Sequence, residues 1–143
     1  LKDLRGHSHT VVTSIALRRA SHPGGGIPEG IAVRTPDGTL LLDSCESLVP
    51  MRSYTDDEID GYLASGGPFD KAGGYGIQDG SFQPVDRKAF GDCFANVMGL
   101  PLCHVVRTLR RIGVEPAGDV PAACMAHLRY DCPVSKTILG GTA

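Results

Sequence analysis

The chain has 143 residues, of which 41% are hydrophobic and 21% are charged, values typical of a globular protein with one core of ordinary size. Its formal net charge of −2 argues against a nucleic acid or an anionic membrane surface as the main partner. The absence of an apolar run of transmembrane length and of a signal peptide, together with five irregularly spaced cysteines, predicts a cytoplasmic protein with reduced thiols.

The start of the chain predicts the tail of a helix followed by a strand. Residues 1–6 are typical of a helix end stopped by Gly6, and because the chain begins without a methionine, we expect further sequence upstream. Residues 9–17 are rich in β-branched side chains, which favours a largely buried strand. Residues 21–30 are rich in glycine and proline, which predicts a flexible insertion outside the core.

A turn signal then joins two further strands. Pro36-Asp37-Gly38 combines the residue types that favour a tight turn. We expect short strands at 31–33 and 39–42, with the second continuing towards Val49.

The helix with the strongest signals begins after Thr55. Thr55 and Glu58 have the spacing of a capping box, and Asp56 and Asp57 lie in the first turn, where the helix dipole favours negative charge. Capping and solubility therefore explain this acidic cluster before a metal site is invoked. The apolar face that we expect to be buried consists of Ile59, Tyr62 and Leu63. Gly66-Gly67 ends the helix.

The helix leads directly into a glycine-rich loop at 68–80. Its four glycines allow positive φ angles and a close approach of the backbone to a ligand, so the loop is suited to presenting N–H groups to an anion. Lys71 adds a mobile positive charge suited to phosphate, and Gln78 offers a donor and an acceptor that could read the edge of a base. Composition alone leaves an ordinary surface connection open as the alternative.

The last third of the chain predicts two more helices. Residues 81–85 should form a short strand and residues 90–95 a short or irregular piece. Residues 100–112 should form a helix with an apolar stripe at Leu102, Val105, Val106, Leu109 and Ile112. The arginines at 107, 110 and 111 are read as a solvated face. Residues 120–128 should form a short helix and residues 135–143 a frayed end, giving an α/β or α+β fold.

Three small groups of residues have side chains suited to a site, and each has a simpler explanation. Cys124, His127 and Cys132 have only a loose zinc-like spacing and are read as thiols beside a surface histidine. His7 and His9 could share one face of a strand, but polar residues at a strand edge explain them as well. No serine has the sequence context of a hydrolase nucleophile.

Four blocks, in this order, resemble the Maf family of nucleoside triphosphate pyrophosphatases. They are Leu-Arg-Gly-His-Ser-His-Thr-Val-Val-Thr at 4–13, Tyr-Thr-Asp-Asp-Glu-Ile-Asp-Gly-Tyr at 54–62, Asp-Lys-Ala-Gly-Gly-Tyr-Gly-Ile-Gln at 70–78, and Asn-Val-Met-Gly-Leu-Pro-Leu at 96–102. The resemblance covers roughly residues 1–114, and the third block is its most specific part. We therefore expect residues 1–116 to be the C-terminal portion of a Maf-like domain and residues 117–143 to be an extension.

The resemblance implies an α/β fold of the Maf/ITPase type, an elongated mixed sheet flanked by helices, with its N-terminal portion missing here. The implied activity is hydrolysis of a nucleoside triphosphate, dTTP or UTP for this branch, to the monophosphate and pyrophosphate. It requires a divalent metal, Mg²⁺ or Mn²⁺, and many members are homodimers. The implied partner is the nucleotide, and neither nucleic acid nor membrane.

The same resemblance assigns roles within the loop. Gln78 stands where the family reads the base, Lys71 would hold phosphate, and Gly73, Gly74 and Gly76 would shape the pocket wall. We expect Asp70 to orient Lys71 or cap the loop rather than bind metal.

The departure from the family lies in its catalytic motifs. The Ser-Pro-Arg-Arg motif and the Gly-Ala-Asp-Thr block, whose Asp is the family's catalytic base, match nothing in the 143 residues and would lie upstream of Leu1, so no catalytic residue and no metal ligand is identified. Cleavage of a phosphoanhydride needs positive charge or metal on the phosphates and a base for water. Two hypotheses follow: a pyrophosphatase whose activity needs upstream sequence, or a catalytically inactive module that binds nucleotide or a partner.

Overall fold

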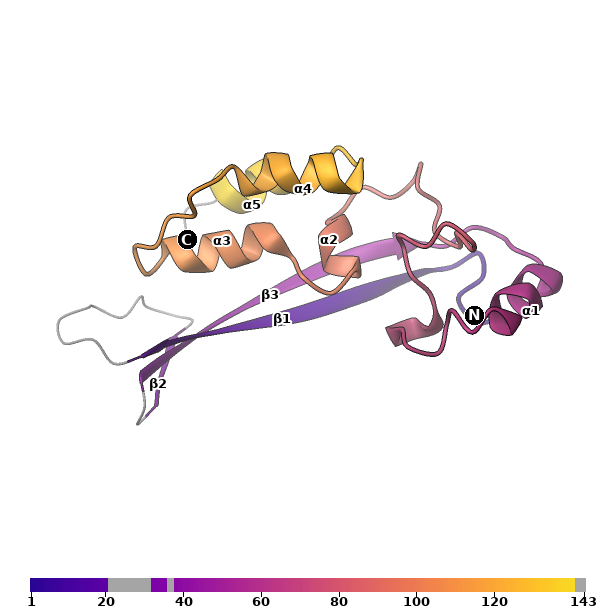
Figure 1. The fold of residues 1–143 in the computed structure, drawn as a ribbon, viewed down its shortest axis with the longest axis horizontal. Helices are drawn as coiled ribbons and strands as arrows, with labels where there is room; N and C mark the ends of the chain where they lie inside the picture. The colour runs from indigo at the N-terminus through magenta and orange to yellow at the C-terminus, as the bar shows by residue number, and fades with distance from the viewer. Residues whose placement is uncertain (21–31, 36–37, 141–143) are drawn as a thin grey trace.

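A computed structural model describes residues 1–20, 32–35 and 38–140 of the chain. Its centre is a long antiparallel pair of strands, β1 (Ser8–Ala20) and β3 (Gly38–Pro50), with β2 (Ala32–Thr35) on the other side of β3 (Figure 1). The pairing runs without a break from Ser8 opposite Pro50 to Ala20 opposite Gly38. The predicted strands are confirmed and are longer than expected, whereas the insertion at 21–30 and residues 36–37 of the turn lie outside the described residues.

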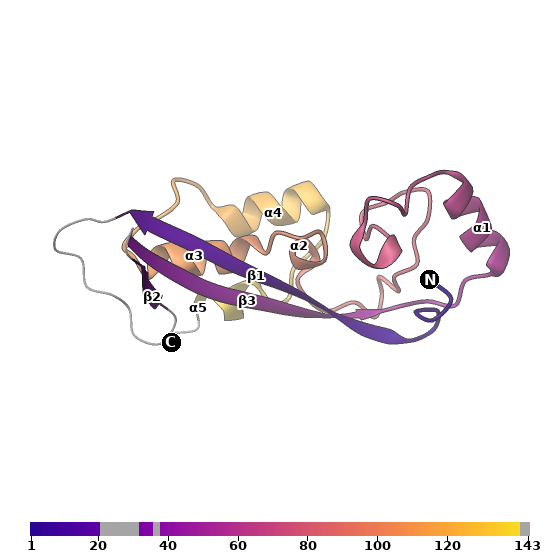
Figure 2. The same cartoon turned by 90° about the horizontal axis from the view of Figure 1, so that it is seen from below.

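The two faces of the β1–β3 pair have different environments. Along β3, Leu41, Cys45, Ser47 and Val49 are buried, the Asp43 side chain on the same face is only 6% exposed, and the alternate residues 42, 44, 46 and 48 are exposed. This alternation is the period of two that a strand with one covered face requires. The helices α2 (Phe94–Val97) and α3 (Leu102–Arg110) lie over the buried face (Figures 1 and 2).

The helix α1 (Asp56–Ala64) forms at the far end of the sheet, and its predicted cap is confirmed. The Thr55 Oγ1 accepts a hydrogen bond from the Glu58 backbone N–H at 3.2 Å, and the Glu58 Oε2 accepts one from the Thr55 N–H at 2.8 Å. Ile59 and Tyr62 are buried as expected. The prediction for Leu63 is wrong: its side chain is 40% exposed because only one edge of this short helix faces the core.

The core beneath α1 is aromatic. The Tyr62 ring stacks on Phe82 with 4.6 Å between centroids, and the Tyr54 ring meets Phe82 edge-on at 5.3 Å. Such pairs add to the free energy gained by burying the rings. The predicted strand at 81–85 is wrong, because only one isolated bridge, between Met51 and Val85, forms there. Pro84 has no N–H to continue a ladder.

The helix α3 is placed as predicted, but its predicted buried stripe is wrong in large part. Of the five apolar residues, only Val106 is fully buried, whereas Cys103, His104 and Thr108 are buried instead. The inward face of α3 carries polar groups because they bind the Asp43 carboxylate of β3, as described below. Periodicity of apolar residues could not reveal that interaction.

The C-terminal part of the described chain is helical up to Gly140. The helix α4 (Val120–Leu128) has the predicted bounds, and the Asp119 side chain caps it by accepting from the Ala122 N–H at 3.0 Å. Residues 135–140 form α5 (Ser135–Gly140), which packs against α3, so the prediction of a frayed end is wrong for this stretch. The described residues contain no division that tests the expected boundary at residue 116.

The start of the chain forms a turn and not the predicted end of a helix. The Arg5 N–H donates to the Leu1 carbonyl at 3.1 Å, and Gly6 adopts the left-handed conformation with φ of 70°. The expected glycine stop is therefore present. Within the described residues, no helix has the length and apolar character needed to cross a membrane. The architecture is mixed α/β, as predicted.

Candidate functional site

A glycine-rich loop follows α1 at the end of the sheet where β1 begins and β3 ends (Figure 2). Two of its glycines occupy the left-handed backbone region, Gly73 with φ of 74° and Gly74 with φ of 72°. They belong to a 3₁₀ turn, Ala72–Gly74, in which the Gly74 N–H donates to the Lys71 carbonyl at 3.0 Å. Other residue types would be strained at both positions, so this backbone path requires glycine.

Lys71 lies across the loop with its ammonium group held at two points. Its Nζ donates to the Gly67 carbonyl and to the Asp70 Oδ1, each at 2.7 Å. The ion pair raises the pKa of Lys71 and lowers the pKa of Asp70, so both groups are charged near neutral pH. The Asp70 side chain is 80% exposed. An anionic ligand could therefore reach Lys71 by displacing the Asp70 carboxylate.

Gly76 lies close to the side chains of both Lys71 and Gln78. A Cβ placed on Gly76 would be 3.1 Å from the Lys71 Cε and 3.5 Å from the Gln78 Oε1. Only glycine leaves both side chains undisturbed at this approach. Gln78 is exposed, and its amide makes no hydrogen bond with another described residue. The side chain that carries a cationic group and an unengaged amide thus both lie close to one backbone position.

The inner side of the loop is fixed to β1 by Tyr75. Its hydroxyl shares a hydrogen bond of 2.9 Å with the His9 Nε2, and the two rings meet edge-on at 5.6 Å. Burial raises the pKa of Tyr75 to about 12 and lowers the pKa of His9. His7 does not join this pair, because its Nδ1 donates to the Arg5 carbonyl at 2.9 Å. His9 therefore has a structural partner in the loop.

Four of the six predicted site residues come together in space: Asp70, Lys71, Gly76 and Gln78. Gly73 and Gly74 shape the turn that precedes them. Their roles in binding stay predictions. Sequence reasoning missed His9 as a partner of the loop and Tyr62 as a neighbour of Gly67, although the helical period did place Tyr62 on the buried face of α1.

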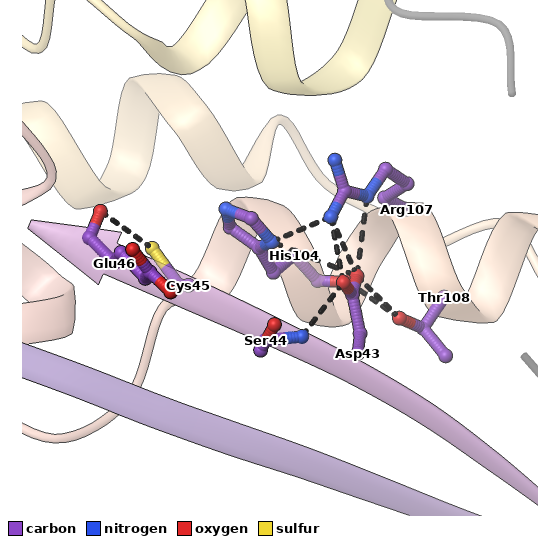
Figure 3. A network of polar contacts seen from close by, with 7 residues as sticks. All are labelled: Asp43, Ser44, Cys45, Glu46, His104, Arg107 and Thr108. Atoms are coloured by element: carbon purple, nitrogen blue, oxygen red, sulfur yellow. Dashed lines mark hydrogen bonds and ion pairs between the residues drawn. The ribbon is translucent and has the colours of Figure 1, made fainter.

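A second polar cluster lies between β3 and α3 (Figure 3). The Asp43 carboxylate of β3, with a side chain only 6% exposed, accepts from the Arg107 Nη2 at 2.7 Å and from the Thr108 Oγ1 at 3.1 Å. The Ser44 N–H donates to Asp43 as well. Despite the desolvation that opposes it, these hydrogen bonds hold the pKa of Asp43 below its ordinary value. The prediction that Arg107 belongs to a solvated face is wrong.

This cluster is closed on itself and is best described as structural. The Arg107 Nη2 also donates to the His104 Nδ1 at 2.7 Å, and burial, followed by the charge of Arg107, lowers the pKa of His104. Every oxygen of Asp43 is engaged by a protein donor. The cluster therefore joins β3 to α3 and leaves no carboxylate oxygen available to a ligand.

The five cysteines are free thiols. Burial raises the pKa of Cys45 to about 12 and that of Cys103 to about 11, so these thiols stay protonated and unreactive near neutral pH. Across the described ranges, no group of three or more His, Cys, Asp or Glu side chains has an arrangement that could hold a metal ion. That finding includes Cys124, His127 and Cys132.

Comparison with known proteins gives one family and a consistent set of relatives. The profile of a family described as Maf-like protein matches residues 1–112. A dTTP/UTP pyrophosphatase of Dehalococcoides mccartyi is 38% identical over 116 residues, which are 81% of this chain and 44% of the relative. Relatives with the same name in Geobacter sulfurreducens and Thermomicrobium roseum are 40% identical over 113 residues and 32% identical over 135 residues. These matches cover 79% of this chain and 50% of the first relative, and 94% of this chain and 53% of the second. The chain spans about half the length of the curated relatives it matches.

Proposed function

Since the chain belongs to the Maf-like protein family, we propose that it binds dTTP or UTP at the loop 68–80 and serves their hydrolysis to the monophosphate and pyrophosphate. The names of its relatives support the reaction and the nucleotides. The observation in the structure that carries the proposal is that the side chains of Lys71 and Gln78 lie next to each other at Gly76. A triphosphate needs a cation at one end, and its base needs a paired donor and acceptor at the other.

Gln78 is the proposed reader of the base. Uracil and thymine present an N3–H donor next to the O4 acceptor, and a glutamine amide offers a carbonyl oxygen and an NH₂ group at matching separation. Because the Gln78 amide is exposed and has no hydrogen bond to another described residue, it can form both bonds in exchange for water, without losing a hydrogen bond to the described part of the protein. Both new bonds then add to affinity.

Lys71 is the proposed phosphate ligand. Its ammonium group already donates to Gly67 and Asp70, and an ammonium group has three donors, so a phosphate oxygen can be added or can replace Asp70. A phosphate carries more negative charge than one carboxylate and therefore competes effectively for Lys71. Asp70 is then released toward solvent, where its side chain already lies.

A divalent ion belongs to the proposal as the companion of the phosphates. The described residues offer no group of three ligands, so they do not fit a metal held by protein side chains alone. Mg²⁺ is commonly bound through substrate phosphates with few protein ligands. We therefore assign Mg²⁺ or Mn²⁺ to the bound triphosphate and derive no chemical step from it.

One observation favours a second function, the binding of a nucleotide without its hydrolysis. The sequence contains neither Ser-Pro-Arg-Arg nor Gly-Ala-Asp-Thr, the motifs in which the family resemblance places phosphate binding and the catalytic base. On this alternative the loop binds dTTP or UTP, and the 143 residues do not activate water. The proposed location is the cytoplasm, in keeping with the five free thiols, and the proposed assembly is a homodimer.

The test measures binding and pyrophosphate release by the purified 143-residue chain with dTTP, UTP and 7-methyl-GTP in the presence of Mg²⁺ or Mn²⁺. We expect dTTP or UTP to bind and Gln78→Ala to weaken that binding about tenfold or more, the loss of two hydrogen bonds. Gln83→Ala, at an exposed glutamine outside the loop, is the matched control. Pyrophosphate release supports the first function, and binding without release supports the second. Failure of all three nucleotides to bind would contradict both.

A further inference from the structure

Phe69, in the glycine-rich loop, has the one aromatic ring that is exposed in the described part of the chain. The residue is 78% exposed, the highest value among the large apolar residues that the structure describes. The other phenylalanines and all four tyrosines are buried or half-buried. Contact with an aromatic ring removes a large apolar area from water, so an exposed ring can add much to the binding of a ligand.

The backbone that carries this ring is held by two successive turns. The Phe69 N–H donates to the Gly66 carbonyl at 3.5 Å, and the Lys71 N–H donates to the Pro68 carbonyl at 3.2 Å. Pro68 is buried, and its ring fixes its own φ angle. The backbone at Phe69 is therefore in place before a ligand arrives, which lowers the entropy lost on binding.

The same segment holds the ammonium group of Lys71. Its Nζ donates to the Gly67 carbonyl and to the Asp70 Oδ1, each at 2.7 Å, and Phe69 lies between these two residues in the chain. The exposed ring is thus carried by the stretch of backbone that surrounds the proposed phosphate ligand.

The Lys71 side chain connects this segment to Gln78. An added Cβ on Gly76 would be 3.2 Å from the Lys71 Cδ and 3.5 Å from the Gln78 Oε1, so the two side chains meet at one backbone position. One loop therefore presents an exposed aromatic ring, an ammonium group and an amide. These groups suit the face of a base, its phosphates and its edge, respectively.

We propose that the Phe69 ring stacks on the face of the uracil or thymine whose edge Gln78 binds. This inference rests on the proposed function of Gln78. Hydrogen bonds from an amide lie in the plane of the base and leave its faces free, so the two residues do not compete. Stacking on an aromatic side chain depends little on which base is present. Phe69 therefore adds affinity for UTP and dTTP alike, whereas Gln78 selects the base.

The first test compares two ligands that differ in having a base, UTP and inorganic triphosphate, each with Mg²⁺ and the purified 143-residue chain. We expect Phe69→Ala to weaken the binding of UTP about tenfold, the usual effect of losing one stacked ring, and to leave the binding of inorganic triphosphate unchanged. Leu63→Ala, at an exposed apolar residue of α1, is the matched control and should change neither. Lys71→Ala should weaken both ligands.

The second test uses the absence of tryptophan from the sequence. Phe69→Trp retains an aromatic face and introduces a single fluorescent reporter at the proposed contact. We expect Phe69→Trp to bind UTP as well as the unchanged chain does, and UTP to quench its emission over the same concentration range in which it binds. Leu63→Trp should show no quenching.

Two outcomes would overturn the inference alone. One is UTP binding that Gln78→Ala weakens and Phe69→Ala does not, and the other is an equal loss of UTP and inorganic triphosphate binding in Phe69→Ala, which would mean that the ring acts only through Lys71. Emission of Phe69→Trp that saturating UTP leaves unchanged would overturn it as well. Failure of the unchanged chain to bind UTP or dTTP would contradict the proposed function itself, so the two failures are distinguishable.

Discussion

Arg107 on α3 donates to both carboxylate oxygens of Asp43 on β3, at 2.7 Å to Oδ1 and 2.9 Å to Oδ2. The planar guanidinium group matches the carboxylate at two points, a geometry that lysine cannot reproduce. This pair fixes the position of α3 relative to β3 (Figure 3). The helical layer is therefore joined to the sheet by a buried charge as well as by apolar packing.

Asp43→Ala should lower the free energy of unfolding by about 3 kcal/mol, because it leaves Arg107 and Thr108 without their acceptor in a largely buried place. Urea unfolding followed by circular dichroism measures the change. The matched control is Glu115→Ala, which removes the exposed partner of Arg110 and should have no measurable effect. Equal effects of the two substitutions would contradict the structural role assigned to Asp43.

Acidification should destabilise the protein through His104. Burial and Arg107 lower the pKa of His104 in the folded state below the ordinary value of 6.5, so the unfolded chain takes up the proton first. The free energy of unfolding should therefore fall as the pH drops below about 6.5 and stop falling once the folded-state pKa is passed. His104→Gln should make this slope shallower, whereas His127→Gln, at an exposed position on α4, should not. His9 contributes to the slope in every variant, since burial lowers its pKa too. An unchanged slope in His104→Gln would contradict the assignment.

Gly76→Ala should separate ligand binding from stability. The new methyl group would lie 3.1 Å from the Lys71 Cε and 3.2 Å from the Lys71 Cδ, and this flexible side chain can move away at small cost to the fold. We expect a melting temperature close to that of the unchanged chain and UTP binding weakened about tenfold, because Lys71 and Gln78 are both displaced. Gly73→Ala is the contrasting variant: its φ of 74° makes alanine strained, and it should lose about 1 kcal/mol of stability. Normal binding by Gly76→Ala would argue against the site.

Thr55→Ala should destabilise α1 by about 1 kcal/mol, the usual effect of losing an N-cap side chain. Because α1 carries Tyr62 and leads into the loop, amide exchange should also become faster at residues 56–64. Thr10→Ala, at an exposed position on β1, is the control and should change neither quantity. A stability loss shared equally by both variants would contradict the capping role.

Sequence patterns correctly predicted the elements whose formation depends on residues close to each other in the chain. The capping box at Thr55, the strand of β-branched residues at 9–17 and the glycine loop could all be placed from the sequence, since each depends on neighbouring residues. The buried face of α3 could not, because Arg107 faces inward only when Asp43, 64 positions earlier, meets it across the sheet. The same limit hid the hydrogen bond between Tyr75 and His9, because these residues are 66 positions apart in the sequence.

The uninterrupted pairing of β1 with β3 has a consequence for the order of folding. Ala20 and Gly38 are the partners nearest in sequence and Ser8 and Pro50 the most distant, so the entropy lost on closing the chain is smallest at the end remote from the loop. Pairing should start there and advance toward Ser8, one residue pair at a time. His9, which holds Tyr75, belongs to the second-to-last pair. The glycine loop is then the last region to acquire its native contacts during refolding and the first to lose them when the sheet frays.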